Sequence, residues 1–362
     1  MRRGAALVVL ALLAARAPRA AAQDSVFGIR GLGFLGRPIS ARSAGMGGGE
    51  AMFDGSSAVN PASLAAWHGL AGWAVGAQSD HSFNAGSGQV SLRSMRFPTF
   101  GFATPVGSRL VIGVAVSDYL NRNWDVQQTD TVMPRDSSLA VKDRIRSAGG
   151  ISDIRFAAAY RLSNRIALGV GVHALSGAAQ TGVERDFPTD SAYHTFAQVT
   201  ETDYRGFGVS LGAFITPLQR VVIGASARFN GRLRADNPGG NTDVHLPTEL
   251  GGGLYVAPWD GVLVAAGQAP ARDVWNVGFG AEVSVVRLFG EVTPLRAGYR
   301  WRQLPFPVGT AALSERAISA GISFSLAAGR ATTDFALEGG SRVAGALTER
   351  FTTLLVGLSI FP

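Results

Sequence analysis

RLVIGVAVSD, residues 109–118, carries the pattern on which the fold prediction depends. Large apolar residues occupy every second position, and small residues fall between them: Leu110, Ile112, Val114 and Val116 against Gly113, Ala115 and Ser117. Successive side chains of a β-strand point to opposite faces of the sheet. The stretch therefore predicts a strand with one large apolar face and one face of small residues.

The same alternation recurs as far as the C-terminus. Large residues stand at 166, 168, 170 and 172, at 275, 277, 279, 283 and 285, and at 318, 322, 324 and 326, with Gly, Ala, Ser or polar residues between them. A soluble β-sandwich would fill its core with the large face and expose the polar one. A transmembrane barrel would turn the large face towards lipid. Alternation alone is compatible with both folds.

The lengths of the connections distinguish these two folds. Short turns near 106–108, 163–164, 217–219, 258–260, 287–289 and 327–329 alternate with longer connections near 79–87, 119–150, 178–198, 232–246, 303–314 and 342–349, and with a shorter one near 269–273. Outer-membrane barrels have short periplasmic turns and long outer loops. The alternation of short and long connections therefore predicts a barrel.

Counting on this basis gives fourteen strands, and the predicted fold class is all-β, a 14-stranded antiparallel transmembrane β-barrel. An even number returns both termini to one side, and most segments have roughly the 9–11 residues that cross a bilayer at a tilt. Aromatic residues near strand ends suit a girdle at the membrane interface, namely Tyr119, Tyr160, Trp259, Trp275, Tyr299 and Trp301. The predicted strands lie near 70–78, 88–105, 109–118, 151–162, 165–177, 199–216, 220–231, 247–257, 261–268, 274–286, 290–302, 315–326, 330–341 and 350–361.

The first 22 residues predict a secretory signal peptide. Arg2 and Arg3 precede an apolar run from Ala5 to Ala15, and Ala20 to Ala22 supply an A-x-A cleavage site. The formal net charge of +7 includes four arginines of this peptide, so the mature chain is close to +3. Because no run of Lys and Arg follows, nucleic acid is not an expected partner. An exported chain with no cysteine uses no disulfide bonds.

Residues 23–69 form a predicted hatch or plug segment, and residues 70–362 form the barrel. The central stretch of the hatch segment, at 42–64, is RSAGMGGGEAMFDGSSAVNPASL. It is rich in Gly and Ser and shows neither helical nor strand periodicity. Such a stretch cannot bury enough apolar surface to fold alone. We expect it to lie in the barrel lumen, where the small-residue faces leave room for it.

The N-terminal SARSAGMGGGEAMFDGSSAVNPASLA resembles the Gly-rich opening and Asn-Pro-Ala motif of FadL-type outer-membrane transporters. It is also similar to the related PorV/PorQ-type proteins, as are YRLSNRIALGVGV, TPLQRVVIGASARF, PLRAGYRW at 294–301 and TDFALEGG at 333–340. The resemblance covers nearly the whole mature chain. It implies a 14-stranded barrel with an N-terminal hatch that blocks the lumen and with a lateral opening for hydrophobic substrates.

The family's Asn-Pro-Ala motif falls on Asn60, Pro61 and Ala62, which are candidate gate residues. Proline fixes its own φ and pushes the preceding residue towards an extended conformation. The Asn60 amide can satisfy backbone groups of a segment that has no β-ladder. A simple turn-shaping role for Asn60 and Pro61 is an equal alternative.

The charged and polar residues predicted to face the lumen are candidate ligand-binding groups: Asp153, Arg155, His173, Arg228 and Glu282. A hydrolase triad of His173, Ser176 and Glu282 is conceivable, but polar residues are typical of any barrel lumen. The five histidines show no metal-ligand spacing, and no G-x-S-x-G motif is present. We therefore expect no enzymatic activity, no metal and no cofactor.

The leading functional hypothesis is a FadL-type channel of the bacterial outer membrane that passes small hydrophobic, fatty-acid-like molecules. Its expected partners are outer-membrane lipid or lipopolysaccharide and the hydrophobic cargo. The alternative is a PorV-like accessory barrel that holds or hands over exported proteins. The short predicted loops and the PorV-like sequence motifs favour this second hypothesis.

Overall fold

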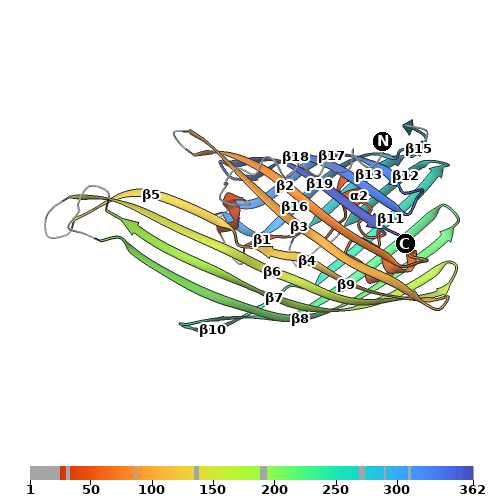
Figure 1. Ribbon diagram of the computed structural model, residues 1–362, viewed down its shortest axis with the longest axis horizontal. Coiled ribbons are helices and arrows are strands. Elements are labelled where there is room, and N and C mark those ends of the chain that lie inside the picture. Colours follow the sequence, from red (N-terminus) through yellow and green to blue (C-terminus); the bar gives the residue numbers. More distant parts are fainter. Residues whose placement is uncertain are drawn as a thin grey trace.

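The computed structural model describes residues 25–29, 33–85, 88–133, 138–187, 194–268, 274–288, 291–308 and 311–361. The predicted signal peptide, residues 1–22, lies outside these described residues. Strands with the predicted alternation dominate the rest of the chain, and Figure 1 shows them running side by side around a central space.

Fourteen strands pair in a closed antiparallel ring, as the sequence predicted. Each strand pairs with the next along the chain, and the last, β19, pairs with the first, β2, from Glu349↔Phe83 to Ile360↔Gly72. Closure leaves the ring without an edge strand. The members of the ring are β2 (Ala71–Ala85), β3 (Gly88–Val106), β4 (Leu110–Asn121), β6 (Leu139–Ser163), β7 (Ile166–Asp186), β8 (Phe196–Leu218), β9 (Val221–Asn237), β11 (Glu249–Trp259), β12 (Val262–Gln268), β13 (Asn276–Val283), β16 (Leu295–Val308), β17 (Ala311–Leu326), β18 (Ala331–Ala344) and β19 (Leu347–Ile360).

Eight shorter elements complete the described structure. The first four belong to the N-terminal part of the chain, which enters the ring; β5 and β10 extend it at one end, and β14 and β15 pair with each other. Among the described residues, no helix is long or apolar enough to cross a membrane. The shorter elements are the 3₁₀-helices η1 (Val26–Ile29) and η2 (Pro61–Ala66), the helix α2 (Ala41–Gly45), and the strands β1 (Phe34–Leu35), β5 (Trp124–Val132), β10 (Gly240–His245), β14 (Arg287–Leu288) and β15 (Glu291–Val292).

The two faces of the strands divide as the alternation predicted. On β4, Gly113, Ala115 and Ser117 are turned inwards and are less exposed than Ile112, which lies on the outer face. The outer face carries many exposed large apolar side chains, including Phe156 and Val170. A soluble protein rarely exposes so large an apolar surface, whereas a barrel in lipid requires one.

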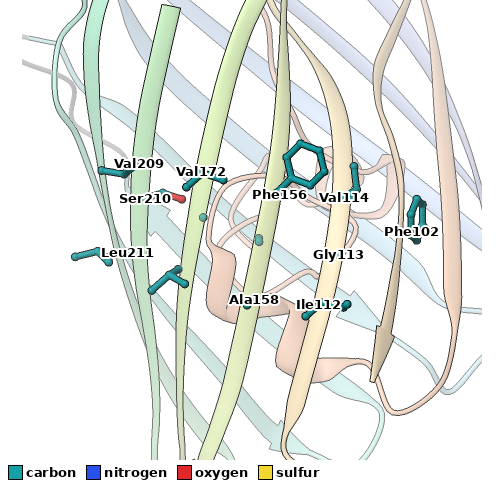
Figure 2. A pocket seen from close by; sticks show the side chains of 13 residues that line it. Phe102, Ile112, Gly113, Val114, Phe156, Ala158, Val172, Val209, Ser210 and Leu211 are labelled. Carbon is teal, nitrogen blue, oxygen red and sulfur yellow. The ribbon is translucent and has the colours of Figure 1, made fainter. Parts of the chain in front are cut away.

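Figure 2 shows a shallow groove on this outer face, lined by side chains of β3, β4, β6, β7 and β8. Phe102, Phe156 and Leu211 flank the groove, and Gly113 and Gly171 form part of its floor. Strand pairing continues without interruption through Gly113↔Ala157 and Ala157↔Gly171. The groove is therefore a depression in an unbroken wall.

Where the structure describes them, all six of the predicted long connections are largely strands, and three of them extend the barrel furthest. In 119–150, 178–198 and 232–246, the ladders of β5 to β10 continue well beyond the apolar part of the wall, and Figure 1 shows them projecting at one end. Cross-strand ion pairs support this extension: Arg144 contacts Asp125 at 2.5 Å, and Arg185 contacts Asp143 at 2.6 Å. The polar composition of these stretches predicted loops, because a strand with polar residues on both faces lacks the alternation of apolar residues that identifies a strand.

Candidate functional site in the barrel lumen

The N-terminal segment, which we define as residues 33–66, lies inside the ring. Its helix α2 packs against β16, β17, β18 and β19, whereas η2 packs against β4, β6, β7 and β8 on another side. In Figure 1 the segment is the red and orange chain among the strands. Met46, Asn60 and Ala62 are fully buried. The segment therefore fills part of the lumen, and its role as a hatch stays a prediction.

Serine hydroxyls around Asp54 order this segment. The carboxylate of Asp54 accepts hydrogen bonds from Ser43 Oγ at 2.8 Å, from Ser57 Oγ at 2.9 Å and from Ser40 Oγ. It also accepts the backbone N–H of Ser56 at 2.9 Å. The Ser40 hydroxyl additionally caps the first turn of α2 through the N–H of Ser43. Short polar side chains thus order residues 40–57, which follow the short β1–β4 ladder and belong to no strand themselves.

Asn60 is the N-cap of η2. Its backbone is extended, with φ −127° and ψ 119°, and its side-chain Oδ1 accepts the N–H of Ala62 at 2.9 Å. Pro61 follows at the first helical position, where a missing N–H costs nothing. The structure therefore gives Asn60 and Pro61 the turn-shaping role, and a function in gating is untested.

The wall opposite η2 carries glycines that make this contact possible. A Cβ on Gly169 of β7 would lie 2.2 Å from the Ala62 nitrogen, and one on Gly212 of β8 would lie 1.8 Å from Asn60 Oδ1. Gly169 and Gly212 are direct cross-strand partners. Both distances are far below a van der Waals contact, so only glycine lets the backbone of η2 approach the wall so closely.

A second pair of glycines contacts the other end of the segment. A Cβ on Gly298 of β16 would lie 2.2 Å from the Gly47 nitrogen, and one on Gly280 of β13 would lie 2.4 Å from the Met46 carbonyl oxygen. Gly280 and Gly298 are also cross-strand partners. The segment thus touches two separate parts of the wall through backbone contacts.

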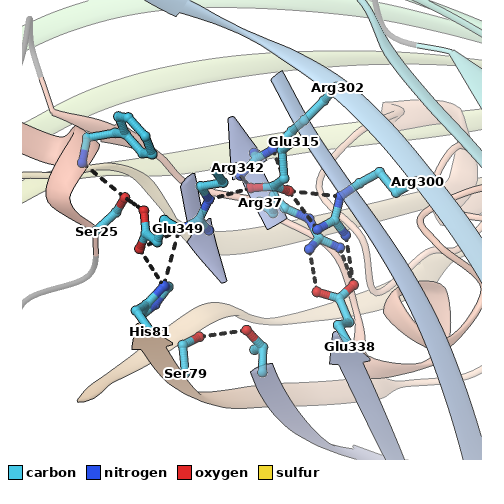
Figure 3. A network of polar contacts seen from close by, with 12 residues as sticks. Ser25, Arg37, Ser79, His81, Arg300, Arg302, Glu315, Glu338, Arg342 and Glu349 are labelled. Atoms are coloured by element: carbon cyan, nitrogen blue, oxygen red, sulfur yellow. Dashed lines mark hydrogen bonds and ion pairs between the residues drawn. The ribbon is translucent and has the colours of Figure 1, made fainter. Parts of the chain in front are cut away.

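A buried arginine–glutamate cluster joins the start of the segment to β16, β18 and β19, and Figure 3 shows it. Arg37 donates to both carboxylate oxygens of Glu338 at 2.6 and 2.8 Å, and Glu338 also accepts from Arg300 at 2.8 Å. Ser25 donates to Glu349 at 2.5 Å. The ring of Phe34 lies 4.3 Å from the Arg342 guanidinium carbon. These contacts tie the segment, and Ser25 before it, to the wall through ion pairs, hydrogen bonds and a cation–π contact.

A second charged cluster contains Glu282. Arg42 of α2 contacts Glu50 at 2.9 Å and Glu282 at 3.3 Å, while Arg296 contacts Glu282 at 2.6 Å and Asp334 at 3.0 Å. Burial raises the pKa of Glu50 to about 7, although Arg42 acts in the opposite direction. Oε2 of Glu50 has no hydrogen-bond partner among the described residues. The neutral form of this carboxyl therefore becomes accessible near neutral pH.

A cavity of about 520 Å³ lies between the N-terminal segment and the wall. This volume falls in the usual range for pockets that bind small molecules. Its lining combines two kinds of side chain. The apolar part includes Leu35, Ile39, Met52, Val59, Leu246, Leu250 and Leu304, and the polar part includes Asp153, His173, Ser210, Arg228, Arg300 and Arg302.

Four of the five predicted lumen residues come together beside this cavity. Asp153 accepts hydrogen bonds from Arg228 Nη1 at 2.8 Å and pairs with His173 Nδ1 at 2.9 Å. Arg155 is buried and is the direct cross-strand partner of His173. Glu282 lies apart from them, in the Arg42–Arg296 cluster. Their function as ligand-binding groups stays a prediction.

The serine that contacts His173 is Ser210, which the sequence interpretation did not select. Ser210 Oγ lies 2.9 Å from His173 Nε2. Ser176 is exposed on the outer face, so the proposed combination of His173, Ser176 and Glu282 is wrong. Period-two alternation contained the signal, because residues 173 and 176 differ in parity and must point to opposite faces. Tyr119, expected in the aromatic girdle, also lines the cavity instead.

The fold and its lumen define a class of protein, namely a closed antiparallel barrel with an apolar outer face and an N-terminal segment packed inside. The sequence model of the BamG family matches residues 1–238, about two thirds of the chain. The chain therefore belongs to the BamG family. Among curated proteins, no sequence is significantly similar to it.

Solved structures with this fold include FadL-type channels. A FadL homologue of Pseudomonas aeruginosa has a TM-score of 0.61 at 14% identity, over 91% of this chain and 99% of that one. The CymD monoaromatic hydrocarbon channel has a TM-score of 0.56 at 15% identity, over 91% of this chain and 98% of that one. The toluene transporter TodX of Pseudomonas putida has a TM-score of 0.55 at 15% identity, over 90% of this chain and 98% of that one. The chain thus shares its barrel fold with these three structures. None of these three is a PorV- or PorQ-type protein, so that finer placement stays a prediction.

Proposed function

We propose that this protein is a FadL-type channel of the bacterial outer membrane that passes small hydrophobic, fatty-acid-like molecules. The barrels that share its fold include transporters of toluene and other monoaromatic hydrocarbons. The exposed apolar outer face suits contact with outer-membrane lipid, and lipopolysaccharide is the expected partner at the outer rim.

The observation that carries the proposal is the mixed lining of the lumenal cavity. One part offers aliphatic side chains such as Ile39, Met52 and Leu250, and another offers the guanidinium group of Arg228. Apolar walls with a few placed polar groups are what a small amphipathic ligand needs. A hydrocarbon chain with one polar end fits this distribution better than a sugar or an ion would.

A cavity-filling variant tests the proposal. Ser226 lines the cavity on β9, and Ala225, the next residue, faces outwards and is exposed. Ser226→Phe places a ring in the ligand space, and Ala225→Phe places the same ring on the lipid face. We expect Ser226→Phe to weaken binding of a fluorescent medium-chain fatty acid at least about tenfold and to slow its uptake into proteoliposomes, with Ala225→Phe close to wild type.

Equal binding and uptake by the two variants would contradict the cavity as the cargo site. Purified wild-type protein that neither binds nor passes the fatty acid would contradict the channel itself. An exported protein that co-purifies with such an inactive barrel would favour the accessory hypothesis instead.

A further inference from the structure

Asp153, His173 and Ser210 form a hydrogen-bonded chain across three adjacent strands. His173 Nδ1 lies 2.9 and 3.0 Å from the two carboxylate oxygens of Asp153, and Nε2 lies 2.9 Å from Ser210 Oγ. An ionised carboxylate can only accept, so Nδ1 carries the proton and Nε2 accepts from the serine hydroxyl. This is the tautomer in which an imidazole serves as a general base for a serine.

Gly171 lies directly against the serine oxygen. It is the cross-strand partner of Ser210, and a Cβ built on it would lie 2.6 Å from Ser210 Oγ and 3.6 Å from His173 Nε2. Any side chain at position 171 would therefore clash with the hydroxyl, and glycine leaves the contact between Ser210 and His173 undisturbed. An acyl carbon attacked by the serine would approach Oγ from the lumenal cavity, which both Ser210 and His173 line.

Two arginines supply positive charge and free donors beside the triad. Arg228 is the cross-strand partner of Ser210, lines the cavity, and binds Asp153 through Nη1. Its Nη2 donates no hydrogen bond among the described residues, and neither do Nε and Nη1 of the buried Arg155. A buried donor without a partner is costly, which makes these groups suitable for an oxygen anion that forms only during a reaction.

The triad also borders a space large enough for a small molecule. Asp153, His173 and Ser210 all line the lumenal cavity. Ser210 additionally borders the outer groove of Figure 2, where its hydroxyl oxygen is drawn between Val172 and Val209. The wall is thus thin at this serine, and the cavity in front of it can hold an apolar acyl chain.

The geometry points to a second activity, hydrolysis of a carboxylic ester with an apolar acyl chain, at Ser210. Ser210 Oγ attacks the acyl carbon while His173 Nε2 takes its proton, and Arg228 Nη2 stabilises the oxyanion. The C–O bond breaks as His173 returns the proton to the departing alcohol. Water then attacks the acyl-serine with His173 as base, which releases the carboxylic acid and restores the serine.

A single introduced cysteine tests the activation of Ser210 without a known substrate, because the chain has no cysteine of its own. Ser210→Cys is compared with Ser226→Cys, which lines the same cavity and is less buried. A histidine-activated thiol is largely ionised at pH 7, whereas an ordinary one is ionised to only a few per cent. We expect iodoacetamide to alkylate Ser210→Cys at least about tenfold faster. Adding His173→Gln should remove this difference.

Hydrolysis itself is measured on the folded full-length protein in detergent. A fluorophosphonate probe should label the wild type at Ser210, and p-nitrophenyl butyrate hydrolysis should fall at least about 100-fold in Ser210→Ala. Ser176→Ala, at an exposed position on the outer face of β7, should keep both signals. Faster migration of unboiled samples on a gel shows that each variant is folded.

Equal alkylation rates for the two cysteine variants, or labelling that survives in Ser210→Ala, would overturn the proposal. Fatty-acid uptake gives an independent readout, because transport does not require the serine. Ser210→Ala that keeps wild-type uptake while losing ester hydrolysis would separate the two activities.

Discussion

Gly169 lies on β7, where a strand would ordinarily favour a β-branched residue. Its lack of a side chain lets the Ala62 nitrogen approach to within 2.2 Å of the position that a Cβ would occupy. Gly212 does the same for Asn60, and both face the lumen. At the scale of single residues, these glycines weaken the strands locally and create the contact surface for the N-terminal segment.

Gly169→Ala should displace η2 from the wall. The backbone atoms of Pro61 and Ala62 would have to move, and overpacking of this kind costs about 1–3 kcal/mol. We expect a lower temperature of gel-shift unfolding and faster proteolysis near residue 60. Gly252→Ala on β11 is the matched control, since nothing lies within 4 Å of its Cβ position. Equal destabilisation by both changes would contradict the close contact described for η2.

Glu50 predicts a pH-dependent stability. Its pKa of about 7 in the fold lies above the ordinary value of 4.5, so the folded protein binds this proton more tightly than the unfolded one. The resulting stability is fully present below about pH 4.5 and is lost as the pH rises to 7. Arg42, Asp54, Glu282 and Arg296 are the charged groups acting on it.

Glu50→Gln should lack this component. Between pH 4.5 and 8, the free energy of unfolding of the wild type should fall by up to about 3 kcal/mol relative to Glu50→Gln. Denaturant titrations at several pH values measure it. Glu201→Gln, at an exposed position of β8, should follow the wild type at every pH. A constant difference between wild type and Glu50→Gln would show that this carboxyl titrates normally.

At the scale of elements, the strands could be read from the sequence because each one carries its own local signal. Alternation and turn residues identified all fourteen members of the ring and most of their lumen-facing positions. The polar extensions of β6 to β9 were not predicted as strands, because their stability comes from cross-strand pairs such as Asp143–Arg185. Whether a polar stretch forms a loop or a strand depends on the residues of the neighbouring strand that pair with it. The local sequence does not identify those residues.

The site was harder to predict than the strands for the same reason. His173 and Asp153 could be placed on the lumen face by parity, but their pairing depends on the register of β6 against β7. Ser210 stands in an alternation of small and large residues, Gly208, Ser210 and Gly212 against Val209 and Leu211, which indicated its face. Its contact with His173 required the register of β7 against β8.

Arg37 should hold the first part of the N-terminal segment in place. Its two hydrogen bonds to the buried Glu338 are themselves partly buried, and Arg300 remains on Glu338 when Arg37 is removed. Removing one partner of a fully buried pair costs about 3–5 kcal/mol, so we expect a cost at or below the lower end of this range. In Arg37→Ala, the amides of residues 33–40 should exchange hydrogen faster than in the wild type. Arg220→Ala removes an exposed pair with Asp260 and should leave this exchange unchanged. Unaltered exchange in Arg37→Ala would mean that Phe34 and the glycine contacts suffice.

At the scale of the whole molecule, the ring and the segment inside it depend on each other unequally. The ring closes through its own ladders, from β2 round to β19, and the N-terminal segment adds to them the two-residue pairing of β1 with β4. The segment, by contrast, has few hydrogen bonds of its own beyond those around Asp54 and its short helices. The barrel should therefore keep its fold without the segment, whereas the segment should not fold without the barrel.

Deletion of residues 42–64 tests this asymmetry and the role of the segment as a hatch. The truncated protein should still migrate faster before boiling than after, because the ring is intact. The lumen left behind is lined by small and charged side chains and should fill with water. In planar bilayers we expect the deletion to raise the single-channel conductance to small ions several-fold over the wild type. Ser226→Ala, which leaves the segment in place, should conduct like the wild type. A folded deletion variant with unchanged conductance would mean that other parts of the chain close the pore.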